Sequence, residues 1–468
     1  MSKTYAGARL RRLREERRLS QAELARVLAI SPSYLNQMEH DSRPLTVPVL
    51  LRLTEAYGID PGFFSERDTT RLLADLREAL AGEITENRVS PADLTDLAHR
   101  MPAVAQVLLD LGRRNQVLSE RLAGTAEGRD AEQAAPRSPH EEIRDFFYRR
   151  QNYLHDTDLA AEHLAARIGI RPGDVLRVLT ARLTDAHGVR LAAATGDHLH
   201  HYDEPTRTLH LSPRLRPGQR AFRMATQLAL LEHGDLLDQE AGTDFPPGSP
   251  ARALARIGIA NYFAAALILP YADFHAGAEE ARYDIERLTD RHGLGYETVC
   301  HRLSTLQRPR LRGVPFSFVR VDRAGNMSKR QSATGFHFSK AGGTCPLWNV
   351  YEAFAAPGRI HVQVAEMPDG QRFLWTARAL TRHRGGWGEP GKTFAIGLGC
   401  ELRHAHRLVY SDGLDLTGAS AATPIGMGCR LCERLTCPQR ALPPLGRPLR
   451  IDQHSTTFVP YPVADPTP

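Results

Sequence analysis

Residues 20–40 read SQAELARVLAISPSYLNQMEH and set the architecture of the N-terminal part. Ser20 is a strong N-cap for a first short helix, and Glu23, three positions later, completes a capping box. Ser31 can cap a second helix, in which Pro32 takes the first position, where its missing N–H is not needed. Two short helices joined by a tight turn predict a helix-turn-helix, which places its second helix in the DNA major groove.

This segment resembles the helix-turn-helix of Cro and the phage repressors, the XRE family, over about residues 6–64. In that family the first residue of the second helix touches DNA phosphate, and early outward positions of the third helix touch base edges. The resemblance implies phosphate contacts from Gln21 and Arg43, and base contacts from Ser33, Asn36 and Gln37. A small helical bundle that binds another protein is the alternative. Because such domains read two half-sites, we expect a homodimer on double-stranded operator DNA.

The composition is typical of a globular chain. Of 468 residues, 42% are hydrophobic and 24% are charged, which argues against wholesale disorder and against a fibrous repeat. The longest apolar run, residues 257–269, is shorter than the ~20 residues that span a bilayer. The first 18 residues contain no apolar core of a secretion signal. We therefore expect a cytoplasmic protein with no membrane partner.

The expected fold class is mainly α with an α+β C-terminal part. Composition shifts divide the chain into a helix-turn-helix domain at 1–66, a helical linker at 67–139, a helical domain at 140–310, and a cysteine-containing domain at 311–468. In the last part, period-two stretches indicate strands. Apolar residues at helical spacing in the linker offer a dimerisation face, or equally a hairpin packed within one chain. They are Leu72, Leu73, Leu76, Leu80, Val104, Val107, Leu108, Leu111 and Leu118.

The middle domain resembles an ImmA/IrrE-type metallopeptidase that has lost its metal ligands. In that layout one helix carries His-Glu-x-x-His, and a second ends in an Ala-Asn-x-Phe-Ala run, here residues 260–264. Two imidazoles one turn apart would hold zinc, and the carboxylate would activate water. The aligned positions are Thr226, Gln227 and Leu230, which cannot take these roles. We therefore expect no catalytic residue and no enzyme activity, with a metallopeptidase-type regulator as the disfavoured alternative.

The last part of this domain is strongly basic. Residues 301–330 carry eight Lys or Arg against one Asp, a local charge of +7 in a chain whose formal net charge is +6. Such a segment can bind a polyanion, and an enzyme cleft without its ligands is commonly reused as a ligand pocket. We expect phosphates on Arg302, Arg308 and Arg310, with Tyr262 in the apolar part that takes an acyl chain. An arginine-rich surface between domains is the alternative.

The cysteines of the C-terminal part are Cys345, Cys400, Cys429, Cys432 and Cys437, the last three in a C-x2-C-x4-C array. In a cytoplasmic chain this spacing indicates metal or cluster ligation rather than disulfides. Three ligands do not close a site, so a fourth must come from elsewhere. Cys400 or Cys345 can complete a 4Fe–4S cluster, whereas His404 or His406 can complete a zinc site. A set of free structural thiols is the third possibility.

Nearly the whole chain resembles the short-chain fatty acyl-CoA-responsive transcriptional regulators of actinobacteria. The clearest segments are RDFFYRRQNYLHD (144–156), ANYFAAALILP (260–270) and IGMGCRLCERLTCPQRALPP (425–444). These regulators join an XRE domain to an ImmA/IrrE-like domain and a cysteine-containing C-terminal domain. The resemblance implies a sequence-specific regulator of propionate (methylcitrate), glyoxylate or acetate metabolism.

The same resemblance implies the effector and the cofactor. The effector is expected to be a short-chain acyl-CoA, and the cofactor a 4Fe–4S cluster, with zinc as the alternative. We take Cys400, Cys429, Cys432 and Cys437 as the ligands of that cluster. A redox-sensing regulator that keeps the iron–sulfur cluster and lacks acyl-CoA input is the alternative function.

Overall fold

The computed structural model forms two compact units, residues 1–134 with 440–468 and residues 135–439, which are described separately. The described residues are 7–17, 19–40, 42–57, 72–73, 75–76, 79, 89–102, 104–112, 139–334, 336, 344–382, 387–388, 391–418, 421–430, 432–444 and 447–464. Much of the predicted linker 67–139, including Leu80 and Leu118, lies outside them.

The first unit contains the predicted helix-turn-helix. Its helices are α1 (Gly7–Glu16), α2 (Gln21–Val27), α3 (Pro32–Glu39) and α4 (Val47–Tyr57). The Ser20 side chain accepts a hydrogen bond from the backbone N–H of Glu23, and the Glu23 carboxylate accepts one from the backbone N–H of Ser20, which confirms the capping box. Ser31 caps α3 in the same way through the N–H of Tyr34. The four helices enclose an apolar core that includes Leu10, Leu13, Leu24, Leu28, Leu35, Met38 and Leu53.

A second helical cluster follows in this unit, built around α6 (Pro91–Arg100). Its core contains Leu76, Leu94, Ala98, Ala105 and Leu109, with Leu72 and Leu73 packed against them. Leu72, Leu73 and Leu76 of the first predicted group therefore pack within one chain. The second group does not: Val104, Val107, Leu108 and Leu111 are exposed by 48%, 58%, 36% and 53%. Their spacing of three, four and seven residues places them on one helix face.

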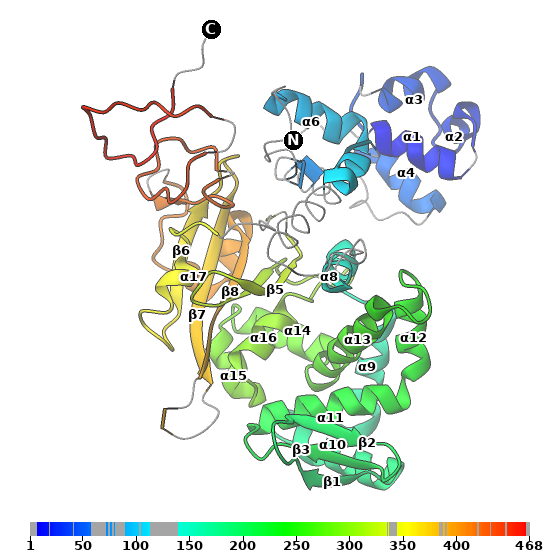
Figure 1. Cartoon of the computed structure of the whole chain (residues 1–468). Coiled ribbons are helices and arrows are strands. Elements are labelled where there is room, and N and C mark those ends of the chain that lie inside the picture. The colour runs from blue at the N-terminus through cyan, green and yellow to red at the C-terminus, as the bar shows by residue number, and fades with distance from the viewer. Residues whose placement is uncertain are drawn as a thin grey trace, which may run out of the picture. The chain divides into compact units, whose positions relative to one another are not determined.

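The second unit begins with a group of helices and a small sheet that lies at one end of this group (Figure 1). The helices are α8 (Pro139–Arg149), α9 (His155–Ile168), α10 (Val175–Ala181), α11 (Pro217–Glu232), α12 (Gly234–Gly242), α13 (Pro250–Ile268), α14 (Tyr271–Glu280), α15 (Ile285–His292) and α16 (Tyr296–Leu303). The strands are β1 (Arg190–Ala193), β2 (His200–Asp203) and β3 (Thr208–Leu211). β3 lies between a parallel β1 and an antiparallel β2.

Helix α13 is the centre of this helical part. It contacts α8, α9, α11 and α12. By length and composition alone it is apolar enough to cross a membrane, but most of the apolar window is buried inside the protein. This burial identifies α13 as a core helix of the second unit.

A mostly antiparallel six-stranded sheet completes the second unit, in the order β5-β4-β8-β7-β6-β9. Its strands are β4 (Ser317–Val321), β5 (Met327–Ser332), β6 (His361–Glu366), β7 (Arg372–Arg382), β8 (Lys392–Glu401) and β9 (Thr423–Pro424), and a short helix α17 (Asn349–Glu352) precedes β6. The observed fold confirms the expected class, a helical protein with a strand-containing C-terminal part.

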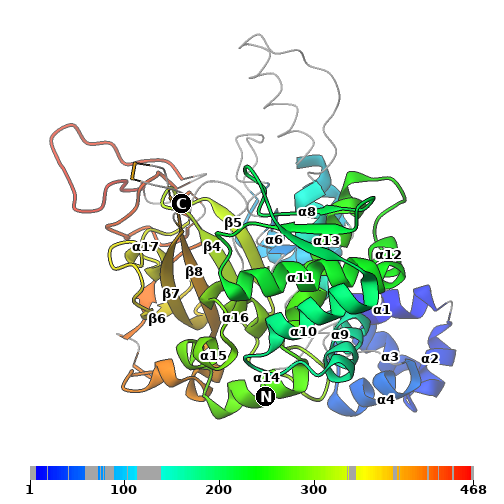
Figure 2. The same cartoon turned by 90° about the horizontal axis from the view of Figure 1, so that it is seen from below.

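The two faces of this sheet pack against different partners. Phe318, Ile396 and Leu398 belong to the same core as the helices, whereas Val319 and Trp375 belong to a separate core on the side of α17. Figures 1 and 2 show the sheet between α17 on one side and α15 and α16 on the other. The helices before residue 310 and the sheet after residue 311 share one apolar core and lie in one compact unit, and the division into domains at this point stays a prediction.

The turn between α2 and α3 contains a residue in an unfavourable backbone conformation. Ala29 has a φ of 48°, a left-handed conformation that costs a residue with a Cβ about 1–2 kcal/mol. Ala29→Gly should therefore stabilise the helix-turn-helix by about 1 kcal/mol, which slows amide exchange in α2 and α3 about fivefold. Hydrogen exchange on the full chain measures this.

The matched control is Ala22→Gly, at an exposed position inside α2. Glycine is unfavourable in a helix by about 1 kcal/mol relative to alanine, so exchange should become faster. Faster exchange in Ala29→Gly as well would contradict the strain at Ala29.

Candidate functional site

The helix-turn-helix presents most of its predicted DNA-binding residues to solvent. Ser33, Asn36 and Arg43 are exposed, whereas Gln21 and Gln37 are half-buried. The Gln21 amide donates hydrogen bonds to Asn36 Oδ1 at 3.2 Å and to Glu39 Oε2 at 2.8 Å. Gln21 therefore fixes the orientation of the Asn36 amide. With its oxygen engaged, Asn36 keeps its NH2 group for an acceptor such as adenine N7.

A buried ion pair below this surface was not predicted from the sequence. Glu39 is 2% exposed, and its carboxylate accepts hydrogen bonds from Arg14 Nε at 2.7 Å and Arg14 Nη2 at 3.2 Å. The pair ties the end of α3 to α1. Glu39 therefore holds the DNA-reading helix in place, while Arg14 also bonds to the Leu19 carbonyl.

The positions of the lost peptidase motif are occupied by a compact polar contact. Thr226 and Gln227 are each 5% exposed on α11. The Thr226 hydroxyl lies 2.9 Å from the Phe222 carbonyl and 3.3 Å from Asn261 Oδ1 on α13. In the described part of the chain, no group of three or more His, Cys, Asp or Glu is positioned to hold a metal ion.

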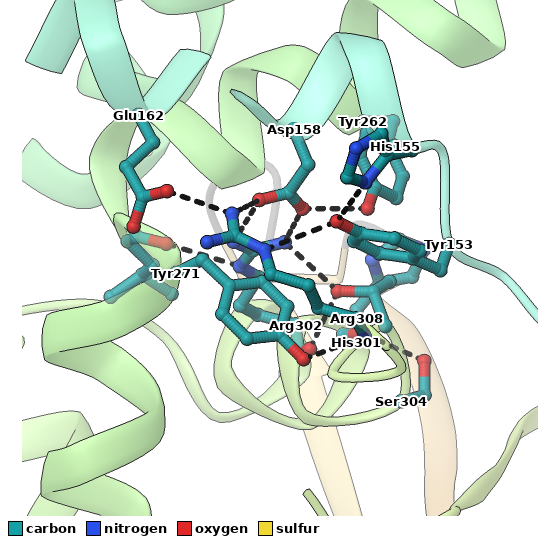
Figure 3. A network of polar contacts seen from close by, with 12 residues as sticks. Tyr153, His155, Asp158, Glu162, Tyr262, Tyr271, His301, Arg302, Ser304 and Arg308 are labelled. Atoms are coloured by element: carbon teal, nitrogen blue, oxygen red, sulfur yellow. Dashed lines mark hydrogen bonds and ion pairs between the residues drawn. The ribbon is translucent and has the colours of Figure 1, made fainter. Parts of the chain in front are cut away.

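The centre of the helical part is a network around one buried carboxylate, Asp158 of α9 (Figure 3). Arg302 of α16 donates from Nη1 to Asp158 Oδ2 at 2.7 Å and from Nη2 to Oδ1 at 3.3 Å. The Tyr262 hydroxyl donates to Oδ2 at 2.7 Å. Both side chains of the ion pair are fully buried. Burial alone would lower the pKa of Arg302, but Asp158 raises it above the usual arginine value.

Arg308 joins the same network from the segment after α16. Its Nη2 lies 3.2 Å from Asp158 Oδ1 and 2.8 Å from Glu162 Oε2, and its Nε donates to the Tyr153 hydroxyl at 3.1 Å. The guanidinium also lies 4.0 Å above the ring of Tyr271. Burial and the Asp158 charge raise the pKa of Tyr153 to about 12, so Tyr153 stays a neutral partner.

This network corrects the predicted phosphate site. Arg302 and Tyr262 are buried and already saturated by Asp158, so in this structure neither is available to a phosphate or an acyl chain. Arg308 has two carboxylate partners. Of the predicted ligand residues, Arg310 is exposed. It lies in the turn after Arg308, with a φ of 65°.

The cysteines separate onto two faces of the large sheet. Cys400 on β8 faces the helix core, whereas Cys345 belongs to the core on the α17 side. Burial raises the pKa of the Cys345 thiol, and the nearby charges of Cys432 and Cys429 raise it further. Cys345 is therefore the upstream cysteine that lies near the C-terminal array. This corrects the expected ligand Cys400. His404 and His406, the expected fourth ligands of the alternative zinc site, flank Ala405, which belongs to the helix core.

The surroundings of Cys345 suit sulfur ligands. Backbone groups of Gly426 and Leu347 form hydrogen bonds with its sulfur, which is one way in which proteins tune clusters. A Cβ on Gly426 would lie 2.6 Å from Cys432 Sγ, so only glycine allows this close approach. Cys437 is half-buried. The described residues thus offer thiols of the right kind in one neighbourhood, although no three of them meet closely enough to hold a metal ion.

Three family models match separate parts of the chain. A helix-turn-helix domain model matches residues 6–62, and an IrrE N-terminal-like domain model matches residues 184–304. The model described as short-chain fatty acyl coenzyme A regulator, C-terminal, matches residues 305–461.

Similar proteins match over nearly their whole length. The HTH-type transcriptional regulator RamB of Mycobacterium tuberculosis is 57% identical, over 98% of this chain and 99% of its own. PrpR of the same organism is 48% identical, over 98% and 96%. The propionyl-CoA carboxylase regulator of Cereibacter sphaeroides is 44% identical, over 99% of both. A solved structure of a Mycobacterium tuberculosis transcriptional regulator is 51% identical with a TM-score of 0.67, and covers 69% of this chain and 99% of its own.

The Asp158–Arg302 pair should be essential for the stability of the second unit. Asp158→Asn leaves the Arg302 charge buried without its counter-ion, and we expect a loss of about 3–5 kcal/mol in the free energy of unfolding. Denaturant titration followed by tryptophan fluorescence measures it. Asp158→Asn combined with Arg302→Met should lose less than Asp158→Asn alone, because no charge then remains buried.

The control is Asp174→Asn, which breaks an exposed ion pair with Arg177 and should change the stability little. Equal losses in Asp158→Asn and Asp174→Asn would show that the buried pair does not hold the helices together.

Proposed function

We propose that this chain, which belongs to the family of short-chain fatty acyl coenzyme A regulators, is a DNA-binding transcriptional regulator whose effector is a short-chain acyl-CoA. The observation that carries this is the contrast between the helix-turn-helix surface and the peptidase-like positions. The helix-turn-helix keeps its exposed polar residues, Ser33 and Asn36, on a capped helix. The peptidase positions instead hold Thr226 bonded to Asn261. A chain built in this way reads DNA and performs no hydrolysis.

The names of one relative and of the C-terminal family model indicate which metabolism this chain regulates. One relative carries the name propionyl-CoA carboxylase regulator, and the C-terminal family model is named for short-chain fatty acyl coenzyme A. We infer that this chain regulates genes of short-chain fatty acid metabolism, of the propionate, acetate, methylcitrate or glyoxylate type. A regulator of chromosomal genes acts in the cytoplasm, where we place it.

We further infer that the chain works as a homodimer. Helix-turn-helix domains read two half-sites through two-fold symmetry. The exposed face formed by Val104, Val107, Leu108 and Leu111 belongs to the same unit as the DNA-reading helices. Covering such a stripe with the same stripe of a second copy removes it from water and brings two recognition helices onto one operator.

The cysteine group supports a bound 4Fe–4S cluster, with zinc as the alternative. Cys345, Cys429, Cys432 and Cys437 would hold it, and the bound group would supply redox sensitivity or a structural clamp. Cys345 provides the buried sulfur that the backbone of Gly426 and Leu347 bonds, while Gly426 leaves room for Cys432.

The test of the function is operator binding with and without effector. Saturating propionyl-CoA should change the affinity of the full chain for its operator at least about fivefold, the lower end of ordinary allosteric coupling. The operator is first selected from random duplexes, and the affinity is measured by fluorescence anisotropy. By reciprocity, operator DNA must change the affinity for propionyl-CoA by the same factor.

The control variant is Gln37→Ala, at a predicted base contact. It should lose the preference for operator over random DNA while it keeps propionyl-CoA binding. If acetyl-CoA and propionyl-CoA leave the operator affinity unchanged, and oxidation changes it, the redox regulator without acyl-CoA input takes the place of our proposal.

The choice of cysteine ligands has its own test. Cys345→Ser should strongly reduce the iron and sulfide content of anaerobically purified protein, because it removes the buried sulfur next to Cys429 and Cys432. Cys400→Ser should keep the content of the unmodified protein, since its thiol lies on the opposite face of the sheet. The reverse result would restore Cys400 as a ligand. Zinc without iron in the unmodified protein would replace the cluster by a zinc site.

A further inference from the structure

Strand β6 holds the segment that follows Cys345. Gln363, in the middle of this strand, donates from Nε2 to the Leu347 carbonyl at 2.8 Å, and its Oε1 accepts a hydrogen bond from the backbone N–H of Asn349 at 3.0 Å. The backbone of Leu347 also bonds the Cys345 sulfur, and the N–H of Trp348 donates to the Cys345 carbonyl at 3.1 Å. One side chain of β6 therefore fixes the backbone that surrounds this thiol.

The end of the same strand holds the cysteine array of the C-terminal part. Arg434 lies between Cys432 and Cys437 in the sequence. Its Nη2 donates to the carbonyls of Glu366 at 2.9 Å and of Met367 at 3.1 Å, and lies 3.5 Å from Glu366 Oε1. Arg434 thus connects the interval between two of the expected sulfur ligands to the last residue of β6 and to the residue after it.

The same guanidinium also contacts the chain just before the array. Arg434 Nε donates to the Ile425 carbonyl at 3.4 Å, and the backbone N–H of Ile425 donates to the Glu366 carbonyl at 3.0 Å. Ile425 precedes Gly426, on which a Cβ would lie 2.6 Å from Cys432 Sγ. Arg434 therefore fixes the chain on both sides of the close approach between Gly426 and Cys432.

Backbone pairing gives the array little support of its own. β9 pairs with β6 only through Thr423 and Pro424, and the described residues between 425 and 437 form no helix or strand. A guanidinium presents several donors in a rigid planar fork, so it can bond a group of neighbouring carbonyls at once. Arg434 therefore continues the attachment to β6 beyond the point where the strand pairing ends.

A second arginine of the array, Arg430, differs from Arg434 in its contacts. It lies between Cys429 and Cys432, and its side chain is exposed. In the part of the chain that the structure describes, Arg430 has no hydrogen bond or ion pair. Because the two arginines carry the same charge within one array, a comparison between them separates the effect of charge from the effect of attachment.

We propose that Gln363 and Arg434 are positioning residues, which hold the two halves of the sulfur ligand set on strand β6 before a metal ion or cluster binds. This proposal rests on the proposed function, in which the ligands are Cys345, Cys429, Cys432 and Cys437. In the described residues these thiols do not meet closely enough to hold a metal ion, so binding must draw them together. Attachment of both segments to one strand reduces the conformational entropy that is lost in this step.

The test is titration of the full chain, prepared without metal, with Co²⁺, whose thiolate complexes absorb in the visible and near-ultraviolet range. Arg434→Gln should weaken Co²⁺ binding about tenfold or more, as the loss of a residue that orients metal ligands does. Arg434→Lys should recover part of this affinity, because an ammonium can still donate to a carbonyl at the strand end but lacks the planar fork. Arg430→Gln is the matched control and should bind Co²⁺ as the unmodified chain does.

Hydrogen exchange on the same metal-free variants separates positioning from folding. In Arg434→Gln the amides of residues 423–437 should exchange faster, whereas those of α9 and α16 should keep their rates. Should α9 and α16 exchange faster as well, Gln363→Ala decides the question. This variant should speed exchange only around residues 345–350 and should also weaken Co²⁺ binding.

Unchanged Co²⁺ affinity in Arg434→Gln and Gln363→Ala would overturn the positioning role and leave the proposed sulfur site standing. Equal weakening in Arg434→Gln and Arg430→Gln would overturn it too, and would assign the effect to charge. Failure of the unmodified chain to bind Co²⁺, iron or zinc would overturn the sulfur site together with this proposal. Operator and propionyl-CoA binding, measured separately, would then still decide the regulatory function.

Discussion

The carboxylate of Asp158 joins the parts of the second unit. It accepts hydrogen bonds from α13 through Tyr262, from α16 through Arg302, and from the following segment through Arg308. Movement of α16 would separate the buried Arg302 charge from its counter-ion, and movement of α13 would remove the Tyr262 hydrogen bond from the carboxylate. Since the chain runs from α16 through Arg308 into β4, the same carboxylate also sets where the sheet begins. The apolar core that the helices share with the sheet packs around this fixed connection between α16 and β4.

Local signals made the helix-turn-helix predictable. Ser20, Glu23 and Ser31 act on backbone groups three residues away, so their role is visible in a short stretch of sequence. The loss of the peptidase motif at Thr226, Gln227 and Leu230 was equally visible, since chemistry there depends on residue type. The division of the remainder into helices followed by strands was also predictable, because it follows from periodicity.

Burial and long-range pairing were not predictable from the sequence. The +7 segment correctly drew attention to residues 301–330, but a sequence does not show that Arg302 meets a carboxylate 144 residues earlier. Charge alone therefore pointed to the wrong members of the segment for an exposed site. The sequence likewise left the fourth cysteine ligand open between Cys400 and Cys345, because it does not show that strand alternation turns the Cys400 thiol toward the helices while Cys345 lies in the core on the other face.

The side chains of β4 alternate between the two faces of the sheet, and this limits where residues can be inserted or deleted. Val319 and Val321 enter the core on the cysteine side, while Phe318 and Arg320 enter the helix side. Deletion of one residue within the strand would exchange these two sets, placing a guanidinium among tryptophans and aliphatic side chains among cations. A change in length is therefore tolerated beyond the strand ends, or at the irregularity between β4 and β5, where the register already shifts beside Arg320 and Val321.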